Sequence, residues 1–298
     1  MRSRDMGQAN ILSKASMHAV ISSATLAMSL AAQCYSQEIT SLNGGYPQED
    51  RRTKSPVPYP HLRQADVMWR KRVWQMIDLR QKINHPLFFP LEEIEDRKSL
   101  FDVIRTGLLE DGSITCYSLG PTQDDDEFRY PMAYAEVELL LNREVVRYVE
   151  DLDTGEKLEK RVLEPITSED IVAYTIKEDW IFDRQRSQLV VRIIGLAPVV
   201  ERRSESGEVI GKKELFWLYF PECRYVFVNA DVFNAHNDEQ RMTFDDLFSK
   251  RMFHGYIIKE ENVYDRFIES YTKGLDALME SERIKEEIFL TEHDLWHY

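Results

Sequence analysis

The sequence predicts an α+β fold in which an antiparallel strand meander is covered by helices. Three segments rich in β-branched and aromatic residues lie in the middle of the chain, at residues 171–182, 189–200 and 214–219. Short polar segments join them, so consecutive strands are expected to pair as neighbours. Amphipathic segments with helix-capping residues lie on both sides of this region, and a long helical segment is expected at the C-terminal end.

An N-terminal amphipathic helix is predicted to precede the meander, over residues 66–84. Its apolar residues recur at spacings of three, four and seven, which would place them on one face. They are Trp69, Val73, Met76, Ile77 and Ile83. Pro86 and Pro90 would end the helix, because a proline disfavours helical backbone at the residue before it. Phe88 and Phe89 would then be presented from an extended segment.

Capping and turn residues predict elements around this region. A helix is expected over residues 99–109 and a strand over residues 114–119, with an Asp-Gly turn between them. The segments 145–149 and 157–163 are predicted to form a β-hairpin, because Gly155 lies in the turn between them.

Three more helical segments are expected. A short one is predicted for residues 134–141, and a second begins at Pro221 and extends to about Val228, since proline is favoured in the first turn of a helix. Asn262 is predicted to cap a last helix that extends to the C-terminal end, with a break at Gly274.

The chain contains a weak internal similarity between residues 99–118 and 243–260. Both segments begin with a hydroxyl side chain that is followed three positions later by aspartate, and both end in a predicted strand. Two explanations fit this similarity: a duplicated helix–strand unit, or two unrelated helices that share the same capping pattern.

The first 36 residues have the pattern of a secretory signal peptide. Cations at Arg2, Arg4 and Lys14 precede an apolar run that is too short to span a membrane. Residues 37–62 contain several glycines and prolines and few apolar residues, so they are predicted to form a flexible linker. Residues 63–298 would then form the folded domain. No later segment approaches about 18 consecutive apolar residues, so no membrane span is expected.

The chain is strongly acidic, with a formal net charge of −14. Such a protein repels phosphate groups, so we expect no binding to nucleic acid.

No pattern typical of a catalytic, cofactor-binding or metal-binding site is found in the sequence. His293 and His297 have helical spacing but lack the glutamate of a zinc-hydrolase motif. Residues 124–127 lack the glycine and distal glutamate of a calcium loop, and residues 207–212 lack the spacing of a phosphate-binding loop. We therefore predict a protein that is not an enzyme and holds no cofactor or metal. The alternatives are an exported envelope hydrolase and a glycan-binding module.

Cys116 and Cys223 would remain after removal of the signal peptide. An even number of cysteines in an exported protein allows a disulfide between them. Both also have apolar neighbours in the sequence, which favours two buried free thiols over a disulfide.

Residues 66–90 concentrate cations and aromatic residues in an otherwise acidic chain, so we predict that they dock on a partner or on a neighbouring subunit. Aromatic residues and arginine carry much of the binding energy of protein interfaces. The predicted interface residues are Trp69, Arg70, Arg72, Trp74, Arg80, Phe88 and Phe89. Trp74 lies off the apolar stripe of the predicted helix, and we expect Trp74→Ala to cost about 2 kcal/mol of binding if it is central.

Four segments carry a more specific pattern. They are MWRKRVWQMIDLR from Met68 with the exit NHPLFFP, KEDWIFDRQRS from Lys177 with RIIGLAP from Arg192, KRMFHGYIIKEENVYDR from Lys250, and the final EHDLWHY. Together, and in this order, they resemble the GldN/PorN family of periplasmic gliding-motility and type IX secretion components. The resemblance spans about Asp66 to Tyr298.

The resemblance implies a structural role without catalysis. Family members bind an outer-membrane lipoprotein of the GldK/PorK type, assemble with it into a large ring, and contact the periplasmic domain of a GldM/PorM-type inner-membrane protein. It also implies a location in the periplasm, peripheral to the periplasmic face of the outer membrane.

Overall fold

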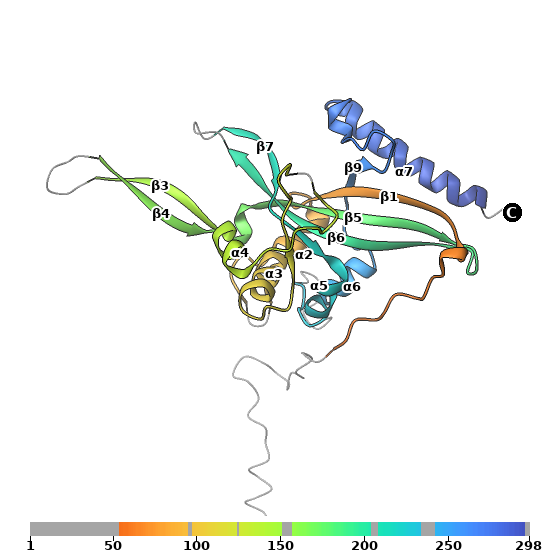
Figure 1. The fold of residues 1–298 in the computed structure, drawn as a ribbon, viewed down its shortest axis with the longest axis horizontal. Coiled ribbons are helices and arrows are strands. Elements are labelled where there is room, and N and C mark those ends of the chain that lie inside the picture. Colours follow the sequence, from red (N-terminus) through yellow and green to blue (C-terminus); the bar gives the residue numbers. More distant parts are fainter. Residues whose placement is uncertain are drawn as a thin grey trace, which may run out of the picture. The chain divides into compact units, whose positions relative to one another are not determined.

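The computed structural model describes residues 54–94, 97–123, 125–150, 157–203, 208–233 and 242–295 (Figure 1). The signal peptide predicted for residues 1–36 and residues 37–53 of the predicted linker lie outside these ranges.

A seven-stranded antiparallel sheet organises the fold. Its strands lie in the order β2-β8-β6-β5-β1-β9, and β7 also pairs with β6 (Figure 1). Their bounds are Val67–Asp78 (β1), Cys116–Tyr117 (β2), Ile171–Asp183 (β5), Gln188–Arg203 (β6), Val209–Glu214 (β7), Trp217–Tyr219 (β8) and Tyr256–Glu260 (β9). A separate two-stranded sheet consists of β3 (Asn142–Glu150) and β4 (Lys157–Pro165).

Six α-helices and four 3-10 turns are described in these ranges. The helices are His85–Phe88 (α2), Leu100–Leu109 (α3), Tyr134–Leu141 (α4), Phe220–Phe227 (α5), Phe244–Ser249 (α6) and Leu275–Leu295 (α7). The 3-10 turns are Gln64–Asp66 (η1), Lys82–Asn84 (η2), Ser168–Asp170 (η3) and Ile268–Ser270 (η4). None of these helices is long and apolar enough to cross a membrane. The predicted α+β class and the long C-terminal helix are confirmed.

The predicted meander is also confirmed. β5 pairs with β6 over almost its whole length, and β6 pairs with β8. Residues 209–214, most of which belong to the polar segment expected to join the second and third strands, instead form β7 against β6. The predicted hairpin corresponds to β3 and β4, whose register starts at Asn142 opposite Pro165. Its turn, with Gly155, lies outside the described residues.

The N-terminal amphipathic helix predicted for residues 66–84 is wrong, because most of this segment forms β1. Its neighbours in the sheet are β5 on one side and β9 on the other. Val73, Trp74 and Gln75 are buried in succession because side chains cover both faces of the sheet here. A strand buried on both faces lacks the alternation of polar and apolar residues that identifies a strand in a sequence. Helical spacing was therefore a misleading signal.

The segment after β1 also differs from the prediction. Pro86 lies in the first turn of α2, where its missing N–H is not needed by the helix. Phe88 therefore ends a one-turn helix, and only Phe89 has extended backbone.

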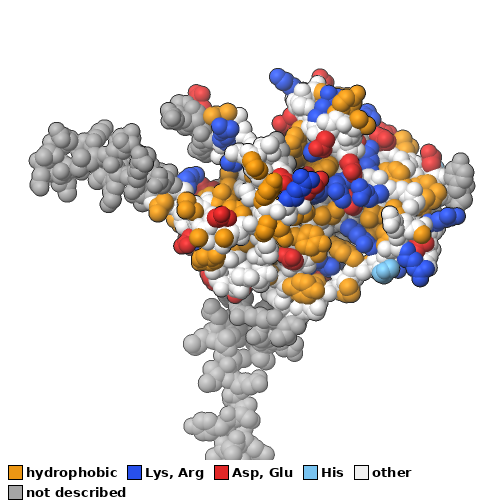
Figure 2. All heavy atoms as spheres, viewed as in Figure 1, with side chains coloured by type: hydrophobic (Ala, Val, Ile, Leu, Met, Phe, Trp, Pro, Cys, Tyr) orange, Lys and Arg blue, Asp and Glu red, His pale blue; other side chains and the backbone are white. Residues whose placement is uncertain are grey.

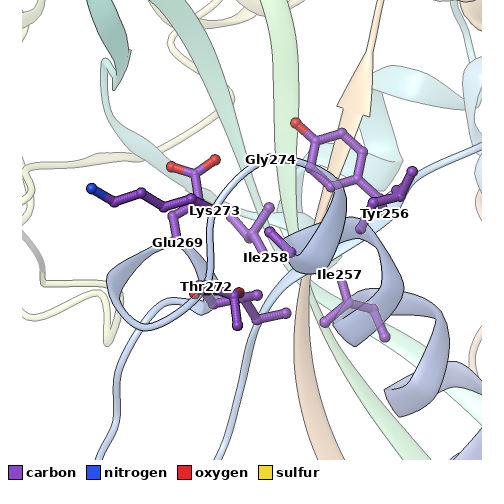
Figure 3. Close-up of a pocket in the computed structure, with 10 residues that line it drawn as sticks. Tyr256, Ile257, Ile258, Glu269, Thr272, Lys273 and Gly274 are labelled. Carbon is purple, nitrogen blue, oxygen red and sulfur yellow. Dashed lines mark hydrogen bonds between the residues drawn. The ribbon is translucent and has the colours of Figure 1, made fainter.

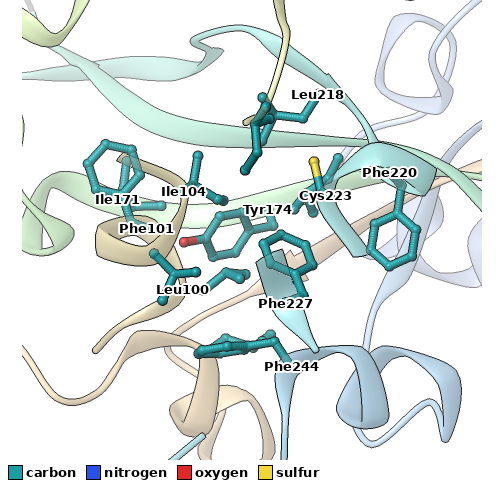
Figure 4. Close-up of a cluster of buried hydrophobic side chains, with 14 of the residues drawn as sticks. Leu100, Phe101, Ile104, Ile171, Tyr174, Leu218, Phe220, Cys223, Phe227 and Phe244 are labelled. Atoms are coloured by element: carbon teal, nitrogen blue, oxygen red, sulfur yellow. The ribbon is translucent and has the colours of Figure 1, made fainter. Parts of the chain in front are cut away.

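The main hydrophobic core lies between one face of the sheet and the helices α3, α4, α5 and α6 (Figure 4). Aromatic side chains dominate it, and Phe220 packs edge-on against Phe248 with ring centroids 5.3 Å apart. Tyr174 of β5 lies among them, and burial raises its pKa. Two smaller apolar clusters flank this core: one contains Trp74 and Trp217, and the other joins β1 and β9 to α7.

The two predicted hydroxyl caps are present. The Ser99 hydroxyl accepts a hydrogen bond from the Asp102 N–H at 3.1 Å, and the Thr243 hydroxyl accepts one from the Asp246 N–H at 3.2 Å. The two capped helices, α3 and α6, are followed by β2 and β9, which lie at opposite ends of the strand order. A duplication of residues 99–118 and 243–260 stays a prediction.

The last helix begins later than predicted. The Asn262 side chain accepts a hydrogen bond from the Tyr264 N–H at 3.0 Å, so it caps a turn and not a helix. Gly274 then adopts a positive φ of 61°, and α7 starts at Leu275. Ile284 and Ile288 of α7 pack in one cluster with Val73 and Ile257.

The final residues of the predicted linker are packed on the domain. The Lys54 N–H donates to the Asn229 side-chain oxygen at 3.0 Å, and the Tyr59 ring lies 4.6 Å from the guanidinium carbon of Arg224. Burial raises the pKa of Tyr59. The prediction of a flexible linker is therefore wrong for the last residues of the segment 37–62. The Tyr59 ring packs against the guanidinium of Arg224.

We predict that Trp74→Ala lowers the free energy of unfolding by about 3–5 kcal/mol, because it removes a buried indole and leaves a cavity. Phe89→Ala is a matched control. Its ring is 38% exposed, so the expected loss is about 1 kcal/mol or less. Urea denaturation followed by circular dichroism measures both values. Similar stability losses in the two variants would contradict the interior position of Trp74.

Candidate functional site

Trp74, one of the predicted interface residues, lies in the interior. Its side chain is only 5% exposed. The ammonium groups of Lys259 and Lys177 lie 4.5 Å and 5.5 Å from its ring centroid. Cation–π contacts of this kind are stronger where water is excluded. The structure therefore supports a packing role for Trp74 within the folded chain.

The predicted basic residues of β1 are paired with carboxylates on neighbouring segments. Arg72 donates two hydrogen bonds to Asp179, at 2.6 Å and 2.9 Å, and this contact raises the pKa of Arg72. Arg70 lies 2.9 Å from Glu261. Figure 2 shows the same local mixing of basic and acidic side chains on the face that it draws. Arg70 and Arg72 therefore help to hold β1 in the sheet.

The remaining predicted residues lie on separate elements. Arg80 follows β1 and contacts Glu201 at 2.8 Å, although its own side chain is largely exposed. Phe88 packs against the main core, and Phe89 stands edge-on to it with ring centroids 5.0 Å apart. Trp69 is half-buried beside the cluster that joins β1 to α7. An interface role for this set of seven residues stays a prediction, and its exposed members are Arg70, Arg80 and Phe89.

Sequence reasoning missed a buried charge cluster around Glu178. This side chain has no exposed area, and it accepts hydrogen bonds from Arg251 at 2.7 Å and from Gln75 at 3.2 Å. The indole N–H of Trp180 donates to the same carboxylate at 3.1 Å. A buried carboxylate is stable only when it is paired in this way. The cluster ties β5 to β1 and to the segment after α6.

Lys177 anchors the loop that precedes α4. Its ammonium group donates to the backbone oxygen of Asp126 at 2.9 Å and lies 3.3 Å from the Asp126 carboxylate. Burial lowers the pKa of Lys177, and the carboxylate opposes that shift. Asp126, which belongs to the acidic run at residues 124–127, therefore forms an ion pair with Lys177.

Within the described residues, no group of three His, Cys, Asp or Glu side chains is arranged to hold a metal ion. His293 lies 3.9 Å from Asp294, and His297 lies outside the described residues.

A hollow of about 510 Å³ lies between β9, η4 and the start of α7 (Figure 3). Most of its lining is apolar and comes from Ile257, Ile258, Ile268, Ala277 and Leu278. Glu269 and Lys273 lie among the lining residues. The volume falls within the range of small-ligand pockets, about 300–1,000 Å³. Its mostly apolar composition suits an apolar group.

A second surface that sequence reasoning missed is the outer face of α7. Ile284 and Ile288 are buried against the sheet, and positions on the opposite side of the helix carry exposed apolar residues. We define this outer face as Leu275, Leu278, Met279, Glu282, Glu286, Phe289 and Leu290. Its apolar members are between 49% and 71% exposed. Several large exposed apolar residues on one helix face are typical of an interaction site.

Cys116 and Cys223 are buried and unbonded in the structure. Burial raises the pKa of the Cys116 thiol to about 12 and raises the pKa of Cys223 further above its ordinary value. Because the thiolate is the reactive form, these thiols are expected to be inert in the folded protein.

We predict that neither cysteine reacts with iodoacetamide at pH 8 in the native mature chain, and that both react in denaturant without reductant. The intact mass would then increase by two carbamidomethyl groups only after unfolding. A disulfide would give the opposite result, because both cysteines would require reductant as well as denaturant before they could be alkylated.

The comparisons with known proteins give one result. Residues 62–297 match the family described as "Gliding motility associated protein GldN". No curated protein matches the chain. The matched region includes every strand of the seven-stranded sheet and α7, and of the described residues it leaves out only 54–61. The chain therefore belongs to the GldN family.

Proposed function

We propose that this protein is a non-enzymatic structural component of a gliding-motility and type IX secretion machinery. The observation that carries this proposal is the match of residues 62–297 to the family of gliding-motility associated proteins. In the proposed role, the mature chain lies in the periplasm, peripheral to the outer membrane. It forms a ring with a GldK/PorK-type lipoprotein and contacts the periplasmic domain of a GldM/PorM-type protein.

The arrangement of charged groups agrees with a scaffold. Glu178, Lys177 and Asp179 of β5 are buried charged groups, and each is bound by a partner from another segment. Their contacts hold strands and loops together. Exposed apolar residues gather instead on the outer face of α7, where another protein could cover them.

We expect the native protein, purified by affinity from gently solubilised envelopes, to elute in a megadalton particle. Mass spectrometry should identify an outer-membrane lipoprotein in the same particle. Recovery of the chain alone, at about the mass of one mature copy, would contradict a ring component. That result would favour the exported hydrolase or the glycan-binding module.

A further inference from the structure

We propose that the outer face of α7, together with the hollow beside it, binds a basic amphipathic helix of another protein. The inference rests on the scaffold role proposed above and deepens it, because a scaffold subunit must hold a partner at a defined surface. It adds the chemistry of that partner, which carries apolar side chains on one face with lysine or arginine between them.

The outer face of α7 is long enough to pack against about four turns of a second helix. Leu275, Leu278 and Met279 form one apolar group at its start, and Phe289 and Leu290 form another near its end. The helix rises about 22 Å from Leu275 to Leu290. Helices pack through side chains at spacings of three and four, so a partner helix of similar length contacts both apolar groups.

The hollow of about 510 Å³ continues this face at the start of α7 (Figure 3). Leu278 belongs to both, because its side chain lines the hollow and is 49% exposed. The side chains of Ile257, Ile258 and Ile268 are almost fully buried and give the hollow its apolar lining. A large apolar side chain of a partner fits such a hollow, and buried anchors of this kind carry much of the binding energy of an interface.

Acidic side chains determine the charge of the partner. Glu282 and Glu286 lie between the two apolar groups, on the same side of the helix. The only lysine and arginine of α7 are Lys285, which lies 3.0 Å from Glu282, and Arg283, which lies 2.7 Å from Glu280. The helix is therefore negative overall. A partner that covers the face must bring cations to its middle, because a carboxylate buried without a partner is costly.

The same charges disfavour a second copy of this face, and an anionic membrane, as the occupant. Two copies of α7 related by a two-fold axis at the middle of the face would place Glu282 and Glu286 against their own counterparts. Like charges placed opposite each other weaken an interface. An anionic lipid surface is repelled for the same reason. A protein helix that carries lysine or arginine is the occupant that these residues favour.

Two designed peptides test the chemistry of the partner. Both are amphipathic helices of about 16 residues, which matches the length of the face. They share one leucine stripe, but one peptide carries lysine at its polar positions and the other carries glutamate. The purified mature chain is titrated into each labelled peptide, and fluorescence anisotropy measures the dissociation constant. We expect the wild-type chain to bind the lysine peptide on the order of 10-fold more tightly than the glutamate peptide.

Charge reversal of the outer face should reverse this preference. Glu282→Lys with Glu286→Lys is expected to bind the glutamate peptide more tightly than the lysine peptide. The control, Glu292→Lys with Asp294→Lys, makes the same charge change on α7 away from the outer face and should keep the wild-type preference. Circular dichroism checks that each variant folds. The exposed ion pair between Glu282 and Lys285 contributes little to stability, so its loss should be tolerated.

The apolar part of the surface has a separate test. Leu278→Ser removes the side chain that joins the hollow to the outer face, and it should weaken binding of the lysine peptide on the order of 10-fold. Leu139→Ser is the matched control, because this side chain is 77% exposed on a different helix, α4. The control should bind the peptide like the wild type.

Several results would overturn the proposal. The first is a wild-type chain that binds neither peptide, or binds both equally. The second is a charge-reversal variant that keeps the wild-type preference, and the third is an equal loss of affinity in Leu278→Ser and Leu139→Ser. Sedimentation velocity would also overturn it if the chain self-associates and Leu278→Ser prevents this, because a second copy would then cover the face. Binding to vesicles of phosphatidylethanolamine and phosphatidylglycerol that Leu278→Ser abolishes would point to a membrane instead.

Particles purified from cells separate this inference from the proposed function. We expect the particle of the Glu282→Lys, Glu286→Lys variant to lack a protein that the wild-type particle contains. If the variant particle retains every protein, the scaffold role stands and the docking surface is wrong. If the wild-type chain is recovered alone but prefers the lysine peptide when purified, the surface stands and the scaffold role is wrong.

Discussion

The position of β1 between β5 and β9 is the constraint on which the rest of the structure depends. β9 pairs with β1 in the sheet, and α7 packs on Val73 of β1 and Ile257 of β9. The C-terminal helix is therefore held by a strand from the other end of the domain. Contacts this distant in sequence are slow to form during folding. The position of α7, and therefore of its outer face, depends on β1 lying in the sheet.

Buried charge pairs help to fix that arrangement. Glu178 binds Arg251, Arg72 binds Asp179, and Arg224 binds Asp245 at 2.7 Å, in each case across a large separation in sequence. An isolated buried charge is costly, so an alternative register that separated any of these pairs would be strongly disfavoured. The basic residues of β1, for which an interface role stays a prediction, are also part of the pairing that positions the strand.

The sequence predicted the helices and strands whose formation depends mainly on residues close to one another in the chain. Ser99 and Thr243 cap their helices because a hydroxyl satisfies a free backbone N–H wherever a helix begins. The meander was predictable because its strands are rich in β-branched residues and are joined by short turns. β1 was not predictable in this way, since Trp74 and Val73 are buried on opposite faces and give no alternation.

Functional features also divide into those that are visible in the sequence and those that appear only in the folded structure. The family could be inferred from the sequence because each of the four segments that resemble it is a continuous stretch of sequence. The four segments also occur in the order that the family has. The outer face of α7 was missed, although the sequence contains it, because Ile284 and Ile288 account for one apolar side and the second side becomes apparent only when the helix bounds are known. The buried environment of Glu178 could not be inferred, since Arg251 and Gln75 reach it only through the folded sheet.

The described chain therefore combines a charge-paired interior with an apolar and acidic helix face that nothing in the same domain covers. A scaffold subunit needs this combination, because its interior must be rigid while its surface remains available to neighbours. The most direct test of this account is a cryo-electron microscopy map of the native particle. We expect the outer face of α7 to lie against another protein of the particle. A map in which the outer face of α7 is open to solvent would contradict it.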